Sequence, residues 1–98
     1  MENKEDTRRE SQVSTMRLAK LIALGPTCVA LYMLYVLHTK LQNSNPIQID
    51  NNSCMNTFGW GKTTFYKAKK ELIRCELISP VIKKDNNNKI TGHFIQIN

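Results

Sequence analysis

The chain has 98 residues and a formal net charge of +6, with 41% of its residues hydrophobic and 22% charged. These values predict one small globular domain and exclude a fibrous, linker-dominated or disordered chain. So few residues cannot both close a core and enclose a deep cleft, and no catalytic triad, carboxylate pair or phosphate loop is present. We therefore expect no enzymatic activity and no cofactor.

The positive charge is concentrated in the C-terminal part of the sequence. Residues 59–98 contain eight Lys and Arg against three acidic residues, a net charge of +5. A local basic excess favours a polyanionic partner, either nucleic acid or an acidic membrane surface. The polar, mixed-charge residues 1–15 are expected to form a flexible tail, which leaves residues 16–98 as the folded domain.

Cys28, Cys54 and Cys75 are separated by 26 and 21 residues, without a closely spaced pair. Zinc sites and disulfide frameworks need closer spacing, and neither His38 nor His93 completes a ligand set. The sequence therefore predicts three reduced, buried thiols and no metal. The N-terminal sequence lacks the apolar region of a secretory signal, so we expect a cytoplasmic protein.

The first predicted element covers residues 16–24, where Leu18, Leu21 and Ile22 follow helical spacing, although a short strand is also compatible. Gly25-Pro26 then interrupts the chain, and a second helix is predicted to run from Pro26 to Leu41. This helix is apolar on all sides, so it requires burial on more than one side.

The surplus apolar surface of the helix at 26–41 predicts a homodimer interface formed by Tyr32, Met33, Val36 and Leu37. Alternatively, residues 16–24 fold back and cover this patch within one chain. A membrane-spanning helix over residues 18–37 is a further alternative, but Gly-Pro near its centre would break such a helix. The pattern favours a buried core helix.

The segment after this helix alternates short elements and turns. Residues 47–49 predict a very short strand, and Asp50, Asn51 or Asn52 can cap a short helix that ends near Thr57. Phe58-Gly59-Trp60-Gly61 is expected to form a tight turn with two packed aromatic rings.

A longer helix is predicted over residues 61–75, because Phe65, Ala68, Leu72 and Cys75 form a narrow apolar stripe. Its opposite face carries Thr63, Lys67, Lys70 and Arg74, flanked by Lys62 and Tyr66, and none of these six residues is acidic. Thr64 lies with Lys62 and Thr63 in the first turn and completes the predicted contact set. Residues 77–97 then predict a β-hairpin whose tip carries Lys83, Lys84, Asn86, Asn87, Asn88 and Lys89.

The order of these elements indicates an α+β fold: three to four helices followed by a C-terminal hairpin. The sequence FGWGKTTFYKAKKELIRCELI and the following strand–turn–strand resemble the winged helix-turn-helix domains of plasmid and phage replication proteins. Gly59, Ala68, Leu72 and Ile78 stand at matching positions. Gly61 departs from the family, which commonly has a capping Ser there, so backbone groups or Thr63 are expected to cap the helix.

The resemblance implies a sequence-specific double-stranded DNA-binding protein. Its second helix would enter the major groove and its wing would contact the backbone or minor groove. It also implies a role in plasmid or phage replication, conjugative transfer or transcription, with a replication or transfer protein as a further partner. A dimer would place two such helices on a repeated or palindromic site. The alternatives are a winged-helix protein-interaction module and a membrane-associated protein.

Overall fold

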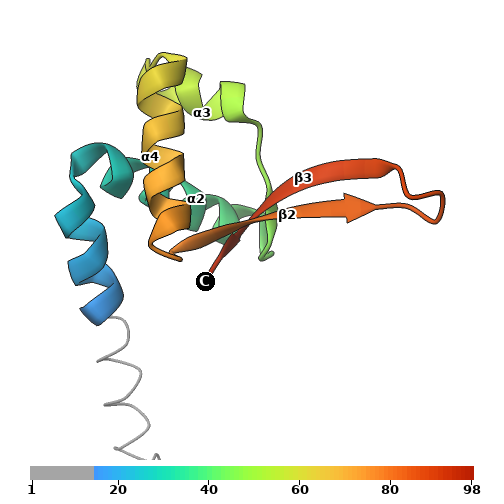
Figure 1. Cartoon of the computed structure of the whole chain (residues 1–98), viewed down its shortest axis with the longest axis horizontal. Coiled ribbons are helices and arrows are strands. Elements are labelled where there is room, and N and C mark those ends of the chain that lie inside the picture. The colour runs from blue at the N-terminus through green and yellow to red at the C-terminus, as the bar shows by residue number, and fades with distance from the viewer. Residues whose placement is uncertain (1–14) are drawn as a thin grey trace, which may run out of the picture.

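The computed structural model describes residues 15–98, which form a helix at residues 15–24, three further helices and three strands. In chain order these are α2 (Pro26–Gln42), β1 (Ile47–Gln48), α3 (Asn51–Phe58), α4 (Lys62–Arg74), β2 (Ile78–Lys84) and β3 (Ile90–Ile97). Figure 1 shows α4 in front of α2, and β2 and β3 as a long hairpin that extends away from the helices. This is a winged-helix-like α+β fold, as predicted.

Backbone geometry and one short polar side chain set the helix boundaries. Gly25 has a φ of 102°, which glycine adopts readily, and Pro26 then opens α2. The Asp50 carboxylate caps α3 by accepting a hydrogen bond of 3.2 Å from the backbone N–H of Ser53. Gly59, with a φ of 68°, ends α3 and leads the chain into α4.

The three strands form an antiparallel sheet in the order β1-β3-β2. β3 pairs with β2 along the hairpin, and near its C-terminal end Ile95 also lies opposite Ile47 of β1. The side-chain amide of Asn45 extends this edge by exchanging two hydrogen bonds of 2.9 Å with the backbone of Ile97. The base of the hairpin is therefore anchored to the helices through β1.

Side chains of α2, α4 and the base of the sheet form one core. Its fully enclosed members include Leu31 and Tyr35 of α2, Phe65 and Leu72 of α4, and Ile78 of β2. The aromatic and branched aliphatic side chains fix how α4 packs across α2. The polar side of α4 is consequently turned away from the core.

The predicted boundaries are confirmed to within one residue at most ends. The helix expected over 26–41 ends at Gln42, and the helix expected over 61–75 covers Lys62–Arg74. The hairpin expected over 77–97 forms from β2 and β3. Local periodicity and turn composition were sufficient for these elements, because each depends on neighbouring residues.

Residues 15–24 form a helix, not the alternative strand, but the helix buries less than its spacing suggested. Leu21 is 2% exposed, whereas Leu18 and Ile22 are 52% and 69% exposed. In Figure 1 this helix lies to the left of α4 and runs into the turn that opens α2. The tail predicted over residues 1–15 lies outside the described residues, except for Thr15, which is helical.

Within residues 15–98 no helix has the length and apolar content needed to cross a bilayer. The segment 18–37, considered above as a membrane span, is divided at Gly25 into two helices. Its second part supplies the buried residues Cys28, Leu31 and Tyr35 to the core.

Candidate nucleic-acid interface

The outward face of α4 gathers the residues predicted to contact DNA. All seven positions are exposed to solvent; they are Lys62, Thr63, Thr64, Tyr66, Lys67, Lys70 and Arg74. Gly61 is the N-cap residue of α4, and no side chain caps this end, so the expected alternative of a cap by Thr63 is not formed. With no capping side chain and no acidic residue in its first turn, this end of α4 keeps its partial positive charge.

One acidic residue, Glu71, borders this face, and Arg74 neutralises it. The Arg74 guanidinium donates hydrogen bonds of 2.6 and 3.1 Å from Nη2 and Nε to Glu71 Oε2. The hydrogen bond from Arg74 holds the pKa of Glu71 below its ordinary value, and the same bond raises the pKa of Arg74. Arg74 is thus already occupied, a pairing that the sequence interpretation did not include.

The lysines of α4 are the unpaired charges of the face. No ion pair other than Arg74–Glu71 forms among residues 15–98, and Lys62, Lys67 and Lys70 make no hydrogen bond there. Their ammonium groups are therefore solvated cations. Three such cations on one helix face, without a free carboxylate beside them, favour binding of a polyanion.

A shallow hollow of about 390 Å³ lies beside α4, between this helix and the start of α2. It is lined by Leu24 and Thr27 on one side and by Thr63, Thr64 and Lys67 of α4 on the other. The two threonine hydroxyls of α4 therefore lie at the border of the exposed face, near α2. Figure 1 shows α4 between the helix at 15–24 and the hairpin.

The tip of the hairpin is held by Asp85. Its carboxylate accepts hydrogen bonds of 2.9 and 3.0 Å from the backbone N–H groups of Asn87 and Lys89, and Asn88 has a φ of 64°. The Asp85 carboxylate is directed into the turn and forms no ion pair with a lysine within residues 15–98. The predicted wing residues are all exposed; these are Lys83, Lys84, Asn86, Asn87, Asn88 and Lys89.

Lys83 differs from the other wing lysines because it packs on an aromatic ring. Its Nζ atom lies 4.3 Å from the centroid of the Phe94 ring, within the range of a cation–π interaction. A Cβ atom at Gly92 would approach this ring to 2.7 Å, so any other residue there would force the ring to shift. The two basic surfaces remain separate, since the hairpin tip extends beyond the helices in Figure 1.

Two basic residues outside the predicted set hold the helix at 15–24 in place. Lys20 Nζ donates a hydrogen bond of 3.2 Å to the carbonyl of Cys75, at the C-terminal end of α4. Arg17 donates to the backbone carbonyl of Asn98. A cation at a helix C-terminus is favourable. Lys20 and Cys75 are 55 positions apart, so local sequence patterns could not indicate the contact.

The residues predicted as a dimer interface are exposed to different degrees. Met33 and Leu37 are 52% and 51% exposed, and Leu41, one turn further along α2, is 70% exposed. Tyr32 and Val36 are half-buried, and Tyr32 packs against the core of its own chain. The helix at 15–24 therefore leaves the outward strip of Met33, Leu37 and Leu41 uncovered.

No cluster of three or more His, Cys, Asp or Glu able to hold a metal occurs within the described part of the chain. Cys28 and Cys54 are buried as predicted, and burial raises the pKa of both thiols. The prediction was wrong for Cys75, which is partly exposed because it ends α4 at the border of the core. Phe58 and Trp60 stack at 4.2 Å in the turn, as expected.

Comparisons with models of protein families, with curated proteins and with solved structures find no match to this chain.

Proposed function

We propose that the chain is a non-enzymatic, sequence-specific binder of double-stranded DNA that uses α4 and the hairpin tip. This proposal rests on the outward face of α4. It has three unpaired lysines, while its one bordering carboxylate is neutralised by Arg74. A face of this kind on the second helix of a helix–turn–helix arrangement fits the major groove of DNA.

In this proposal the first turns of α4 lie closest to the base edges. Lys62, Thr63, Thr64, Tyr66 and Lys67 supply donors and hydroxyl groups that can read the edges in the major groove. Lys70 lies further along the helix and contacts phosphates. Arg74 contributes less than Lys70, because binding a phosphate requires Arg74 to leave Glu71.

The hairpin tip supplies a second contact surface. Its lysines attract phosphates regardless of sequence. The amides of Asn86, Asn87 and Asn88 can bond to adenine edges or to minor-groove acceptors. The tip therefore has both the sequence-independent and the sequence-reading chemistry of a wing.

A homodimer through α2 accompanies this proposal. Met33 and Leu37 are half exposed on one strip, and covering an apolar side chain completely stabilises by about 1.5–3 kcal/mol relative to leaving it in water. A second copy related by a two-fold axis covers the same strip on both chains. The DNA site is then repeated or palindromic, with half-sites about one helical turn apart.

The cellular role follows from the resemblance to replication-protein domains alone. A chain that holds a binding module without catalytic groups acts by occupying, bending or marking DNA. Origin binding in plasmid or phage replication, conjugative transfer, or transcriptional regulation are such roles, and the first two imply a replication or transfer protein as partner.

The binding experiment begins with selection of sites from a random duplex pool, followed by fluorescence anisotropy on the selected site. Thr63→Ala and Lys67→Ala should each weaken specific binding by about 1–3 kcal/mol if the side chain reads a base. Lys89→Ala should weaken binding to all sequences alike. Lys40→Ala, which removes an exposed lysine from α2, is the matched control and should change little.

Failure to enrich any site, with no duplex binding at 50 mM salt, would overturn DNA binding and favour a protein-interaction module. If α4 substitutions are silent while hairpin substitutions abolish recognition, the hairpin is the reading element.

The dimer is tested separately by sedimentation equilibrium. Wild-type chain should be dimeric at micromolar concentration, and Leu37→Glu should give monomers with lower DNA affinity. A wild-type monomer, both free and on a single half-site, would contradict the dimer.

A further inference from the structure

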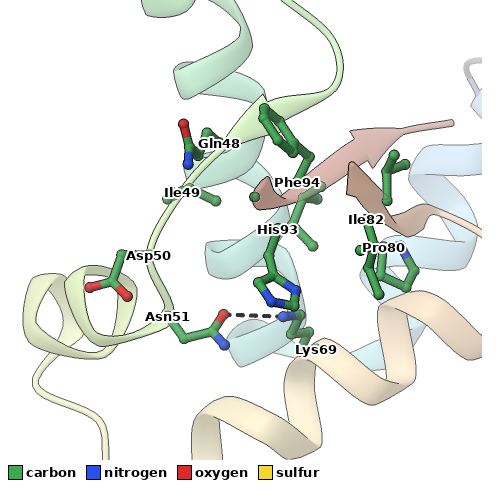
Figure 2. Close-up of a pocket in the computed structure, with 12 residues that line it drawn as sticks. Gln48, Ile49, Asp50, Asn51, Lys69, Pro80, Ile82, His93 and Phe94 are labelled. Carbon is green, nitrogen blue, oxygen red and sulfur yellow. Dashed lines mark hydrogen bonds between the residues drawn. The ribbon is translucent and has the colours of Figure 1, made fainter. Parts of the chain in front are cut away.

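A groove of about 420 Å³ lies beneath the hairpin, between β2 and β3 on one side and α4 with the start of α3 on the other. The proposed DNA contacts do not use it. Its volume is within the range of small-molecule sites, which are mostly apolar with a few converging polar groups. Figure 2 shows side chains from the β1–α3 segment, α4 and both hairpin strands directed into this groove.

The hairpin supplies an apolar wall. Pro80 lies opposite Ile95, and Ile82 lies opposite His93, so these four side chains share one face of the hairpin. Ile82 is 52% exposed and lines the groove. Ile49 contributes apolar surface from the opposite side. A flat apolar group would cover surface that water now contacts.

The base of the groove holds a cation without an anionic partner. Lys69 is half-buried, and its Nζ donates one hydrogen bond of 3.1 Å to Asn51 Oδ1. The same Nζ atom lies 5.9 Å from the centroid of the Phe65 ring. An ammonium group has three N–H donors, so two form no hydrogen bond within the described residues and can be donated to a ligand. Because Asn51 accepts through Oδ1, its amide NH₂ also remains as a donor. In Figure 2 the His93 ring points toward this Lys69–Asn51 pair.

The one carboxylate lining the groove does not neutralise Lys69. Asp50 Oδ2 accepts hydrogen bonds of 3.2 and 3.3 Å from the backbone N–H and the hydroxyl of Ser53, and so caps α3. Burial lowers the pKa of Lys69, as expected for a cation held away from water without a counter-ion. A bound anion would relieve this cost.

We propose that this groove binds an organic anion, a carboxylate or phosphate monoester on a flat apolar body. The anionic group lies on Lys69 and Asn51, and the apolar body lies against Pro80 and Ile82. Neutral analogues of the same shape bind more weakly, because they leave the Lys69 ammonium unpaired. The same anionic chemistry could come from a DNA phosphate, which the experiment separates from a free ligand.

The probes are benzoate and phenyl phosphate, with benzamide and benzyl alcohol as neutral analogues of matched shape. Each is titrated into the full chain without DNA, and the amide signals of Asn51, Lys69 and His93 are followed by NMR. Ligands of this size bind with dissociation constants of about 0.1–10 mM. Both anions should give saturable shifts at these three amides, and the neutral analogues should bind at least about tenfold more weakly.

Lys69→Met should weaken binding of both anions by about tenfold or more, whereas Lys69→Arg should keep it within about threefold. Lys40→Met, which removes an exposed lysine outside the groove lining, is the matched control and should leave binding unchanged. Dispersed amide signals identify variants that remain folded; if Lys69→Met is unfolded, Lys69→Gln replaces it.

Absence of saturable shifts, equal binding of benzamide and benzoate, or unchanged binding in folded Lys69→Met would each overturn the proposal. A DNA phosphate as the occupant would appear differently: no probe binding, together with a DNA salt slope reduced by about one in Lys69→Met. That result also overturns the free-ligand proposal. Because the probes are titrated without DNA, failure of DNA binding leaves this test intact.

Discussion

Tyr35 carries a buried hydroxyl that has no hydrogen-bond partner among residues 15–98. The side chain is 0% exposed and belongs to the core cluster. Folding therefore removes the hydroxyl from water without replacing its hydrogen bonds. An unsatisfied buried polar group costs about 1–3 kcal/mol, whereas the ring itself stabilises the core.

We expect Tyr35→Phe to stabilise the fold, because it keeps the ring and removes the unsatisfied oxygen. A void smaller than a methyl group offsets part of the gain, at a cost below about 1 kcal/mol. The net gain is about 1 kcal/mol, which raises Tm by about 4–8 °C in a domain of this size.

Urea and thermal unfolding followed by circular dichroism measure this change. Tyr32→Phe is the matched control, because Tyr32 is half-buried on the same helix and its hydroxyl is not an unsatisfied buried group. It should alter stability by no more than about 0.5 kcal/mol. A loss of stability in Tyr35→Phe, at unchanged Tyr32→Phe, would refute the reasoning by showing that the hydroxyl has a partner in solution.

Three further predictions follow from the described contacts. Burial raises the pKa of Tyr35 above its ordinary value of 10.0, so Tyr35 ionises at lower pH in the unfolded chain than in the folded chain. The free energy of unfolding is therefore at its full value below about pH 10 and falls as pH rises, by up to about 1.4 kcal/mol per pH unit. Urea unfolding at pH 9, 10 and 11 should show that the free energy of unfolding falls less with pH in Tyr35→Phe than in the wild-type chain. An equal fall in both chains would contradict this prediction. Asp50→Ala should lower the free energy of unfolding by about 1 kcal/mol, because it removes the side-chain cap of α3. Asp50→Ser should retain most of this free energy, as measured by urea unfolding. Equal losses in the two variants would show that the cap contributes nothing. Glu71→Gln should raise DNA affinity by about three- to eightfold at 100 mM salt, because it frees Arg74 as one added phosphate contact. Glu76→Gln makes the same charge change off the α4 face and should raise affinity less. An equal rise in both variants would show that only the net charge of the chain matters.

Local sequence patterns predicted most of the helices and strands. The stripe of Phe65, Ala68 and Leu72 fixed which side of α4 is buried, and therefore which side is exposed. The Gly25-Pro26 interruption and the Asp50 cap are likewise determined by adjacent residues. The α4 face and the hairpin tip could be predicted for the same reason.

Features that depend on distant residues were not predictable in this way. Lys69 and His93 line one groove because the hairpin lies over α4, although 24 positions separate them in the sequence. The spacing of Leu18 and Ile22 was helical, but no local pattern indicated that helix 15–24 would bury Leu21 alone. The Arg74–Glu71 pair is different: its three-residue spacing was visible in the sequence and indicates such a contact.

The salt dependence of binding to the selected DNA site tests the central claim most directly. Six exposed lysines of α4 and the hairpin lie outside ion pairs within residues 15–98: Lys62, Lys67, Lys70, Lys83, Lys84 and Lys89. If all six contact phosphates, the logarithm of affinity falls with the logarithm of salt concentration with a slope of about −5 per subunit. Affinity then drops about a thousandfold between 50 and 200 mM salt. Lys84→Ala with Lys89→Ala should reduce the slope by about two, and Lys40→Ala should leave it unchanged. A flat response over this range, or a slope insensitive to the hairpin lysines, would contradict the proposed interface.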